Sequence, residues 1–214
     1  MKTIASCVEN LIRHQPFVED ALSRKIINYS ALAEDFQPKI EQELGRSINS
    51  GSIVMALRRY FPRKRIKDKQ LRDLGDITVR SGITDFTFLN STTILDSQSR
   101  LLEAVKNIPK AYFTYSSTFH ESNILVSNAL TELVKTEFAT ETCVMVKSDL
   151  SSLSIALPEN NSKTVGLYFY IFKLLAYEGI PIFEMLSTSN YFTLFLEKEY
   201  VNQAFALVNE IKGN

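Results

Sequence analysis

Two polar segments in the last third of the chain carry residues suited to binding a small zwitterion. The first, from Pro158 to Gly166, precedes a predicted helix, whose N-terminal amides favour an anion. The second, from Ser187 to Asn190, follows a predicted strand and offers oxygens that accept hydrogen bonds from an ammonium group. An amino acid carries both of these charges. The candidate ligand-binding residues are Asn161, Ser162, Thr164, Val165, Gly166, Ile182, Ser187, Ser189 and Asn190.

The second segment is also open to a purely structural interpretation, because Ser and Asn are favoured in ordinary hairpin turns. Gly166 is the residue that would allow a ligand to approach the backbone closely. The two interpretations stay open at the level of the sequence.

A basic segment, residues 58–72, contains eight Lys and Arg residues and one acidic residue, Asp68. A cluster of this kind neutralises phosphates, so DNA is a candidate partner. The candidate nucleic-acid-binding residues are Arg58, Arg59, Arg63, Lys64 and Arg65. The alternative is a solvated basic helix that pairs with acidic residues elsewhere in the chain.

The net charge of zero hides an asymmetry that fits either interpretation. Residues 1–75 hold 14 Lys and Arg against 9 Asp and Glu, whereas residues 76–214 hold 10 against 15. A basic head on an acidic ligand-binding body has this pattern, and so do two domains that dock on each other.

No recognised catalytic constellation is present, so we expect a protein that is not an enzyme and needs no metal or cofactor. His14 and His120 have no nucleophile at motif spacing, and HExxH, GxSxG, CxxC and phosphate-loop signatures are missing. Cys7 and Cys143 are too few for a disulfide framework, and no stretch near the N-terminus has signal-peptide character. These features favour a reducing, cytoplasmic location.

The N-terminal region, residues 1–75, is predicted to be a domain of three or four short helices. Amphipathic spacing marks a helix at 4–14, and Ser30 and Ser50 are candidate N-caps of two later helices. This order resembles the helix-turn-helix or winged-helix domains of bacterial regulators. The alternating stretch 76–89 is then either the wing of that domain or the first strand of the next.

From residue 83 onward the hydrophobic period alternates between that of strands and that of helices. The expected order is β-α-β-β-α-β over 83–147 and β-α-β-β-α from 152 to 212, with separate strands at 142–147 and 152–157. This order predicts an α+β protein with two ferredoxin-like βαββαβ units, 76–147 and 148–214, the second borrowing a strand from the first.

The second unit resembles the C-terminal ACT domain of aspartokinases. The matching segments are Leu-Ser-Ile-Ala-Leu (153–157), Thr-Val-Gly (164–166), Ile-Phe-x-Leu-Leu-Ala-x-x-Gly-Ile (171–180), Ile-x-Glu-Met-Leu-Ser-Thr-Ser (182–189) and Ala-x-x-Leu-Val (204–208). Residues 83–147 resemble a more degenerate ACT unit. The resemblance implies modules that pair in dimers, bind amino acids at the paired interface and change the state of an attached domain.

The predicted helix 163–178 also favours a homodimer. Its run from Gly166 to Tyr177 contains one charged residue, Lys173, so it is apolar almost all round, yet it is too short to span a membrane. One side can lie on its own sheet, and the other needs a neighbouring unit or a second subunit.

The sequence therefore favours an amino-acid-sensing regulatory protein, in which a ligand at the ACT units modulates the N-terminal domain, for instance in a transcription regulator. Two alternatives remain. One is a regulatory subunit of an amino-acid biosynthetic enzyme such as an aspartokinase, and the other is a structural ACT protein without a ligand. The sequence contains no Lys-rich phosphate site and no Gly-rich phosphate loop, so only the regulatory module of the aspartokinases is matched.

Overall fold

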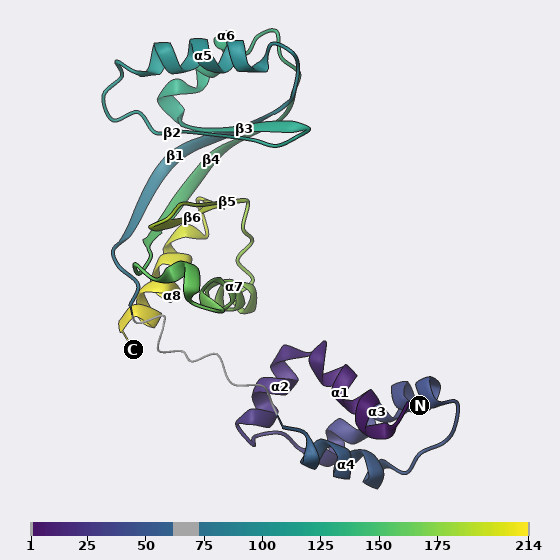
Figure 1. Cartoon of the computed structure of the whole chain (residues 1–214). Coiled ribbons are helices and arrows are strands. Elements are labelled where there is room, and N and C mark those ends of the chain that lie inside the picture. The colour runs from purple at the N-terminus through teal and green to yellow at the C-terminus, as the bar shows by residue number, and fades with distance from the viewer. Residues whose placement is uncertain (1, 62–72, 214) are drawn as a thin grey trace. The chain divides into compact units, whose positions relative to one another are not determined.

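The computed structural model, shown in Figure 1, describes residues 2–61 and 73–213. The chain divides into two compact units, Met1–Lys67 and Asp68–Asn214. The described part of the first contains helices, and the second combines helices with a six-stranded sheet. The expected α+β class is confirmed.

Residues 2–61 of the helical unit form four helices around one apolar core. They are α1 (Ile4–Arg13), α2 (Pro16–Ser23), α3 (Tyr29–Leu44) and α4 (Ser50–Arg59). Val8, Ile12, Phe36, Ile40 and Ile53 are buried together in this core.

The caps of α3 and α4 differ from the prediction. Asn28 Oδ1 accepts from the backbone amides of Ser30 and Ala31 at 3.0 and 3.3 Å, so Ser30 lies inside the first turn. Asn49 Oδ1 accepts from the Gly51 amide at 2.7 Å, which makes Asn49 the cap of α4. Asn and Ser are equally favoured N-caps, so the chemistry of the prediction was correct and the position was not.

All strand pairs of the sheet are antiparallel, in the order β2-β3-β1-β4-β6-β5. The strands are β1 (Ile77–Leu89), β2 (Phe113–Ser117), β3 (Glu121–Ser127), β4 (Cys143–Ala156), β5 (Glu184–Ser187) and β6 (Tyr191–Glu197). Residues 76–89 therefore supply a strand of the sheet, which decides between the two interpretations of that stretch.

Two long strands, β1 and β4, run through both halves of the sheet. Residues 83–88 of β1 lie between β3 and the first half of β4, whereas residues 77–81 pair with residues 151–155, which in turn pair with β6. The second ferredoxin-like unit thus completes its βαββα order with the beginning of β1. The predicted borrowing of a strand is confirmed. The two strands expected at 142–147 and 152–157 are one continuous strand, β4.

The change of direction between the halves has a local cause. Gly82 in β1 and Asp149 in β4 both have positive φ, 73° and 59°. The strand register shifts on either side of Ile83. Such irregularities bend a strand pair and let it serve two sheet halves.

Helices cover one face of each half, as Figure 1 shows for α5 and α6 above the first and for α7 and α8 below the second. They are α5 (Ile94–Val105), α6 (Thr131–Glu137), α7 (Leu167–Tyr177) and α8 (Val201–Gly213). No helix among the described residues has the length and apolarity needed to cross a bilayer.

Each helical layer has its own apolar core. Phe86 and Ile124 of the first half are buried with Leu101 of α5. Leu153 and Ile171 are buried in the corresponding core of the second half.

The opposite, helix-free faces of the two halves pack on each other. Ile83, Leu125, Leu150 and Phe195 form this third cluster and are all buried. The Tyr112 ring lies 6.4 Å from that of Phe195 and extends the cluster. The result is a helix-sheet-sheet-helix arrangement, in which Asp85 of β1 is removed from water.

Candidate ligand-binding site

A pocket of about 480 Å³ lies in the second half, between the β4–α7 loop, the first turn of α7 and the β5–β6 turn. Its volume is within the range of about 300–1,000 Å³ that is usual for small-molecule sites. The lining residues are Glu159, Asn161, Ser162, Thr164, Tyr168, Ser187, Thr188, Ser189 and Asn190.

The β4–α7 loop is held in place by its own polar groups. Asn161 Nδ2 donates to the carbonyl oxygens of Pro158 at 2.9 Å and Ser189 at 2.7 Å, which ties the loop to the β5–β6 turn. The Leu157 amide donates to the Asn190 carbonyl oxygen at 2.8 Å, which is a second hydrogen bond between the loop and the β5–β6 turn. The amide of Asn161 is therefore a structural tie, and its carbonyl oxygen is the group left for a ligand.

On the other side of the pocket, Tyr168 connects α7 with β5. Its hydroxyl lies 2.9 Å from Ser187 Oγ, and its ring packs edge-on against Phe192 with centroids 4.7 Å apart. The packed ring fixes the hydroxyl at the wall of the pocket, where it can donate to an anion.

The N-terminus of α7 is open in the way that an anion site requires. Gly166 is the N-cap residue, with φ 84°, and it has no side chain to satisfy the first amides of the helix. These amides carry the positive end of the helix dipole. A short 3-10 turn, Asn161–Lys163, precedes the cap, so the helix begins at Leu167 and not at residue 163.

Six of the nine predicted residues lie together in the pocket, and three do not. Val165 is 72% exposed and does not line the pocket. Ile182 packs against the apolar core beneath α7. Gly166 contributes its backbone geometry at the cap and is not among the lining residues.

Sequence reasoning missed Glu159, Tyr168 and Thr188. Tyr168 belongs by sequence to the apolar run of α7, but a tyrosine in the first turn of a helix can reach a neighbouring loop with its hydroxyl. Glu159 lies in the polar segment between Pro158 and Gly166, where its carboxylate can pair with an ammonium group. It is the one charged side chain among the lining residues.

The candidate nucleic-acid-binding residues are described only in part. Arg58 and Arg59 are exposed in the last turn of α4, where positive charge is favourable, and the Arg58 guanidinium lies 6.0 Å from the centre of the Tyr29 ring. Arg63, Lys64 and Arg65 lie outside the described residues.

The candidate catalytic and metal-binding groups are scattered. Burial raises the pKa of the Cys7 thiol, with a further contribution from Glu43, and Cys143 is exposed on the sheet. His14 Nδ1 is hydrogen-bonded to the carbonyl oxygen of Asn10 at 2.8 Å. Among residues 2–61 and 73–213, no group of three His, Cys, Asp or Glu side chains has the arrangement of a metal site.

Comparison with solved structures identifies the fold of the Asp68–Asn214 unit. The regulatory subunit of aspartate kinase from Thermus flavus superposes with a TM-score of 0.54 at 11% identity, covering 65% of this chain and 98% of that one. The ligand-free regulatory subunit from Thermus thermophilus gives 0.51 at 10% identity, with coverages of 64% and 98%. The unit has the ACT-containing fold of aspartokinase regulatory subunits.

Full-length aspartokinases show the same fold in part of their length. Clostridium acetobutylicum aspartate kinase, described as an allosteric enzyme, superposes with a TM-score of 0.52 at 12% identity, covering 63% of this chain and 34% of that one. No protein-family model and no curated protein matches the sequence. The likeness is therefore one of fold.

Proposed function

We propose that this chain is an amino-acid-sensing regulatory protein, whose ligand binds in the pocket between the β4–α7 loop and the β5–β6 turn. The observation that carries the proposal is the distribution of charge around that pocket. The open N-terminus of α7 and the Tyr168 hydroxyl offer donors, and the Glu159 carboxylate with the serine hydroxyls offers acceptors.

This arrangement suits both ends of an amino acid. The carboxylate of the ligand accepts from the first amides of α7 and from Tyr168, as anions do at helix N-termini. Its ammonium group donates to Glu159, and the oxygen of Asn161 adds a neutral acceptor. The ligand then bridges the loop and the turn, which Asn161 already connects, so binding stiffens this end of the unit.

The resemblance to aspartokinase ACT domains supports a regulatory role for this site, and the ACT-containing fold is in agreement with it. We include in the proposal a cytoplasmic homodimer without catalytic activity of its own. Helix α7 buries Leu167, Ile171 and Leu175 against its own sheet and exposes Phe169 and Tyr177 on its outer side, where a second subunit can pack.

A thermal-shift screen of the twenty amino acids tests the ligand. A ligand at a hundredfold excess over its dissociation constant stabilises the native state by about 2.7 kcal/mol, which a screen detects easily. Glu159→Gln removes the charge that faces the ammonium group and is expected to weaken binding about tenfold or more. Tyr168→Phe is expected to weaken it less, because the α7 amides remain.

Glu178→Gln is the matched control, since Glu178 lies at the other end of α7 and accepts from Gln203 at 3.2 Å. The control is expected to bind as the wild type does. If no amino acid raises the melting temperature, or if Glu159→Gln responds like the control, the proposed site is wrong and the structural ACT alternative gains.

The partner that responds to the ligand is either the helical unit or a separate enzyme. Two exposed arginines on α4 favour the helical unit acting on DNA. The second candidate, a regulatory subunit of an amino-acid biosynthetic enzyme, is favoured because the ACT-like part covers 98% of the Thermus regulatory subunits.

A further inference from the structure

In the first half of the sheet, the carboxylate of Glu141 is held by three hydroxyl groups from a distant part of the chain. Ser91 Oγ donates to Glu141 Oε2 at 2.5 Å. Thr93 Oγ1 and Ser97 Oγ both donate to Glu141 Oε1, at 2.9 and 2.8 Å. The donors come from the β1–α5 loop and the first turn of α5, whereas Glu141 precedes β4.

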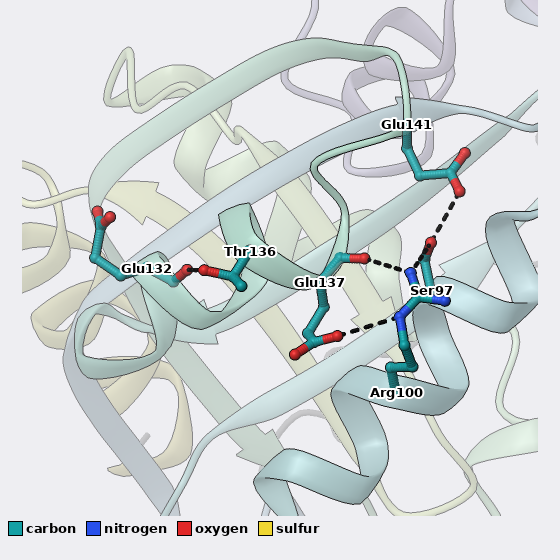
Figure 2. Close-up of polar contacts among 6 residues, drawn as sticks. All are labelled: Ser97, Arg100, Glu132, Thr136, Glu137 and Glu141. Atoms are coloured by element: carbon teal, nitrogen blue, oxygen red, sulfur yellow. Dashed lines mark hydrogen bonds and ion pairs between the residues drawn. The ribbon is translucent and has the colours of Figure 1, made fainter.

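Ser97 is fully buried, and the orientation of its hydroxyl hydrogen is set by its neighbours. Arg100 Nη2 donates to Ser97 Oγ at 2.9 Å and to the carbonyl oxygen of Glu137 at 2.8 Å, as Figure 2 shows. Because the Ser97 oxygen accepts from Arg100, its own hydrogen is directed to Glu141. Arg100 also pairs with the Glu137 carboxylate at 3.2 Å, which keeps the guanidinium in place.

The site holds the charged form of the acid. Burial acts to raise the pKa of Glu141, but the hydroxyls of Ser91, Ser97 and Thr93 and the charge of Arg100 act in the opposite direction and lower it overall. The hydroxyl groups of Ser91, Thr93 and Ser97 are called the cradle below. Ser91 and Thr93 are exposed, so the cradle is accessible to solvent once Glu141 is removed.

The loop that carries Ser91 and Thr93 corresponds to the β4–α7 loop, which lines the pocket of the second half. The Asn90 amide donates to the His120 carbonyl oxygen at 2.8 Å, as the Leu157 amide does to Asn190 at 2.8 Å. The loop that follows is short in the first half, residues 90–93, and long in the second, residues 157–166. Both loops lead into the helix that begins beside the site.

An asparagine ties each loop to the facing hairpin turn. Asn90 Nδ2 donates to the Thr118 carbonyl oxygen at 2.8 Å, as Asn161 Nδ2 does to Ser189 at 2.7 Å. The first half therefore reproduces the frame of the ligand pocket, with a carboxylate from its own chain at the start of the helix.

We propose that Ser91, Thr93 and Ser97 form a binding site for a carboxylate, which Glu141 fills as an intramolecular ligand. Arg100 is a positioning residue that orients Ser97. The first half is thereby held in one state without an added ligand, and under the proposed function the chain keeps a single amino-acid site, in the second half. The carboxylate site itself does not depend on that function.

Replacement of the tethered carboxylate by a free one tests this proposal. Glu141→Ala removes a CH₂–COO⁻ group, which acetate matches in size and charge. The full-length variant is expected to melt at a lower temperature by scanning calorimetry. Sodium acetate, added at constant ionic strength against sodium chloride, is expected to restore about 2–4 °C more than in the wild type, with saturation.

Three controls separate binding from a general salt effect. Glu132→Ala removes an exposed carboxylate on α6, which pairs with Lys135 at 2.8 Å, and is expected to show the acetate response of the wild type. Acetamide, which lacks the charge, is expected to leave Glu141→Ala unchanged. Adding Ser97→Ala to Glu141→Ala is expected to reduce the acetate response.

Each outcome decides the proposal. If Glu141→Ala is unfolded without acetate, recovery of its far-ultraviolet circular dichroism on addition of acetate supports the site, and failure to recover overturns it. If the variant is folded but acetate acts no more strongly than chloride, Glu141 is an ordinary structural contact and the site does not exist.

Discussion

At the residue scale, Asp85 is a buried carboxyl group whose pKa is raised by its surroundings. It is fully buried on the inner face of β1, where Asn123 Nδ2 donates to Oδ1 at 2.6 Å and Oδ2 has no hydrogen-bond partner within the described structure. Burial raises the pKa of Asp85 to about 6, with a further contribution from the negative charge of Glu184. Lys147 is its register neighbour on β4 but pairs with Glu197 at 2.8 Å.

This shift predicts a stability that falls as the pH rises. The folded pKa is about 6 and the ordinary value is 3.8, so the fold favours the protonated form. The stability is full below about pH 4 and is lost as the pH rises through about 6. Each unit of pKa corresponds to about 1.4 kcal/mol, so the total is on the order of 3 kcal/mol.

Asp85→Asn is therefore expected to stabilise the protein at neutral pH, by up to about 3 kcal/mol, and to change little near pH 4. The amide keeps an acceptor for Asn123 and removes the buried charge. Urea denaturation at several pH values measures the difference. Asp76→Asn, whose side chain is 99% exposed, is the control and is expected to be nearly neutral at every pH. Equal stability of Asp85→Asn and wild type at neutral pH would contradict the prediction.

At the element scale, the start of α7 depends on a backbone conformation that other residues rarely adopt. Gly166 has φ 84°, in the left-handed region, and it turns the long β4–α7 loop into the helix. A Gly166→Val variant is consequently a poor probe of ligand binding, because any loss of binding would be mixed with backbone strain.

Gly166→Ala is expected to destabilise the protein by about 1–2 kcal/mol, which is the usual cost of a side chain in the left-handed region. Gly166→Asn is expected to lose clearly less, since Asn tolerates this conformation through local hydrogen bonds. Denaturant titration of both variants measures the free energy of unfolding. Equal losses in the two variants would show that strain at φ is not the cause.

At the scale of the whole molecule, the question is whether the basic end of α4 contacts phosphates. Arg58→Ala with Arg59→Ala is expected to weaken duplex binding and to reduce the salt dependence by about one unit for each lost contact. Lys39→Ala is the control: Lys39 lies 3.9 Å from Asp35 on α3 and should matter little. An unchanged affinity at low salt would assign the arginines to a solvated surface or to pairing within the protein.

The same titration separates the two regulatory proposals. Repeating it with the amino acid found in the thermal screen asks whether ligand and DNA affect each other's affinity, as an allosteric switch requires. DNA binding that is indifferent to the ligand, or no DNA binding at all, would favour the regulatory-subunit alternative.

The order of elements was readable from the sequence because it is local. The strand and helix periods arise from residues two or about four positions apart, so the β-α-β-β-α pattern and the polar loop before α7 could be predicted. The ends of elements were less certain. Asn28 and Ser30 have the same capping chemistry, and only the backbone geometry shows which of them caps α3.

The contacts between distant segments were decided by the tertiary structure alone. Tyr168 meets Ser187, and Ser97 meets Glu141, only because each pair lies on elements that one sheet brings together. Likewise β4 is one strand because its second half pairs with β1 and β6. The hydrophobic pattern along β4 itself does not show this pairing. Sequence patterns report which face of an element is buried, but they do not report what lies against it, and the candidate binding groups of this protein depend on the latter.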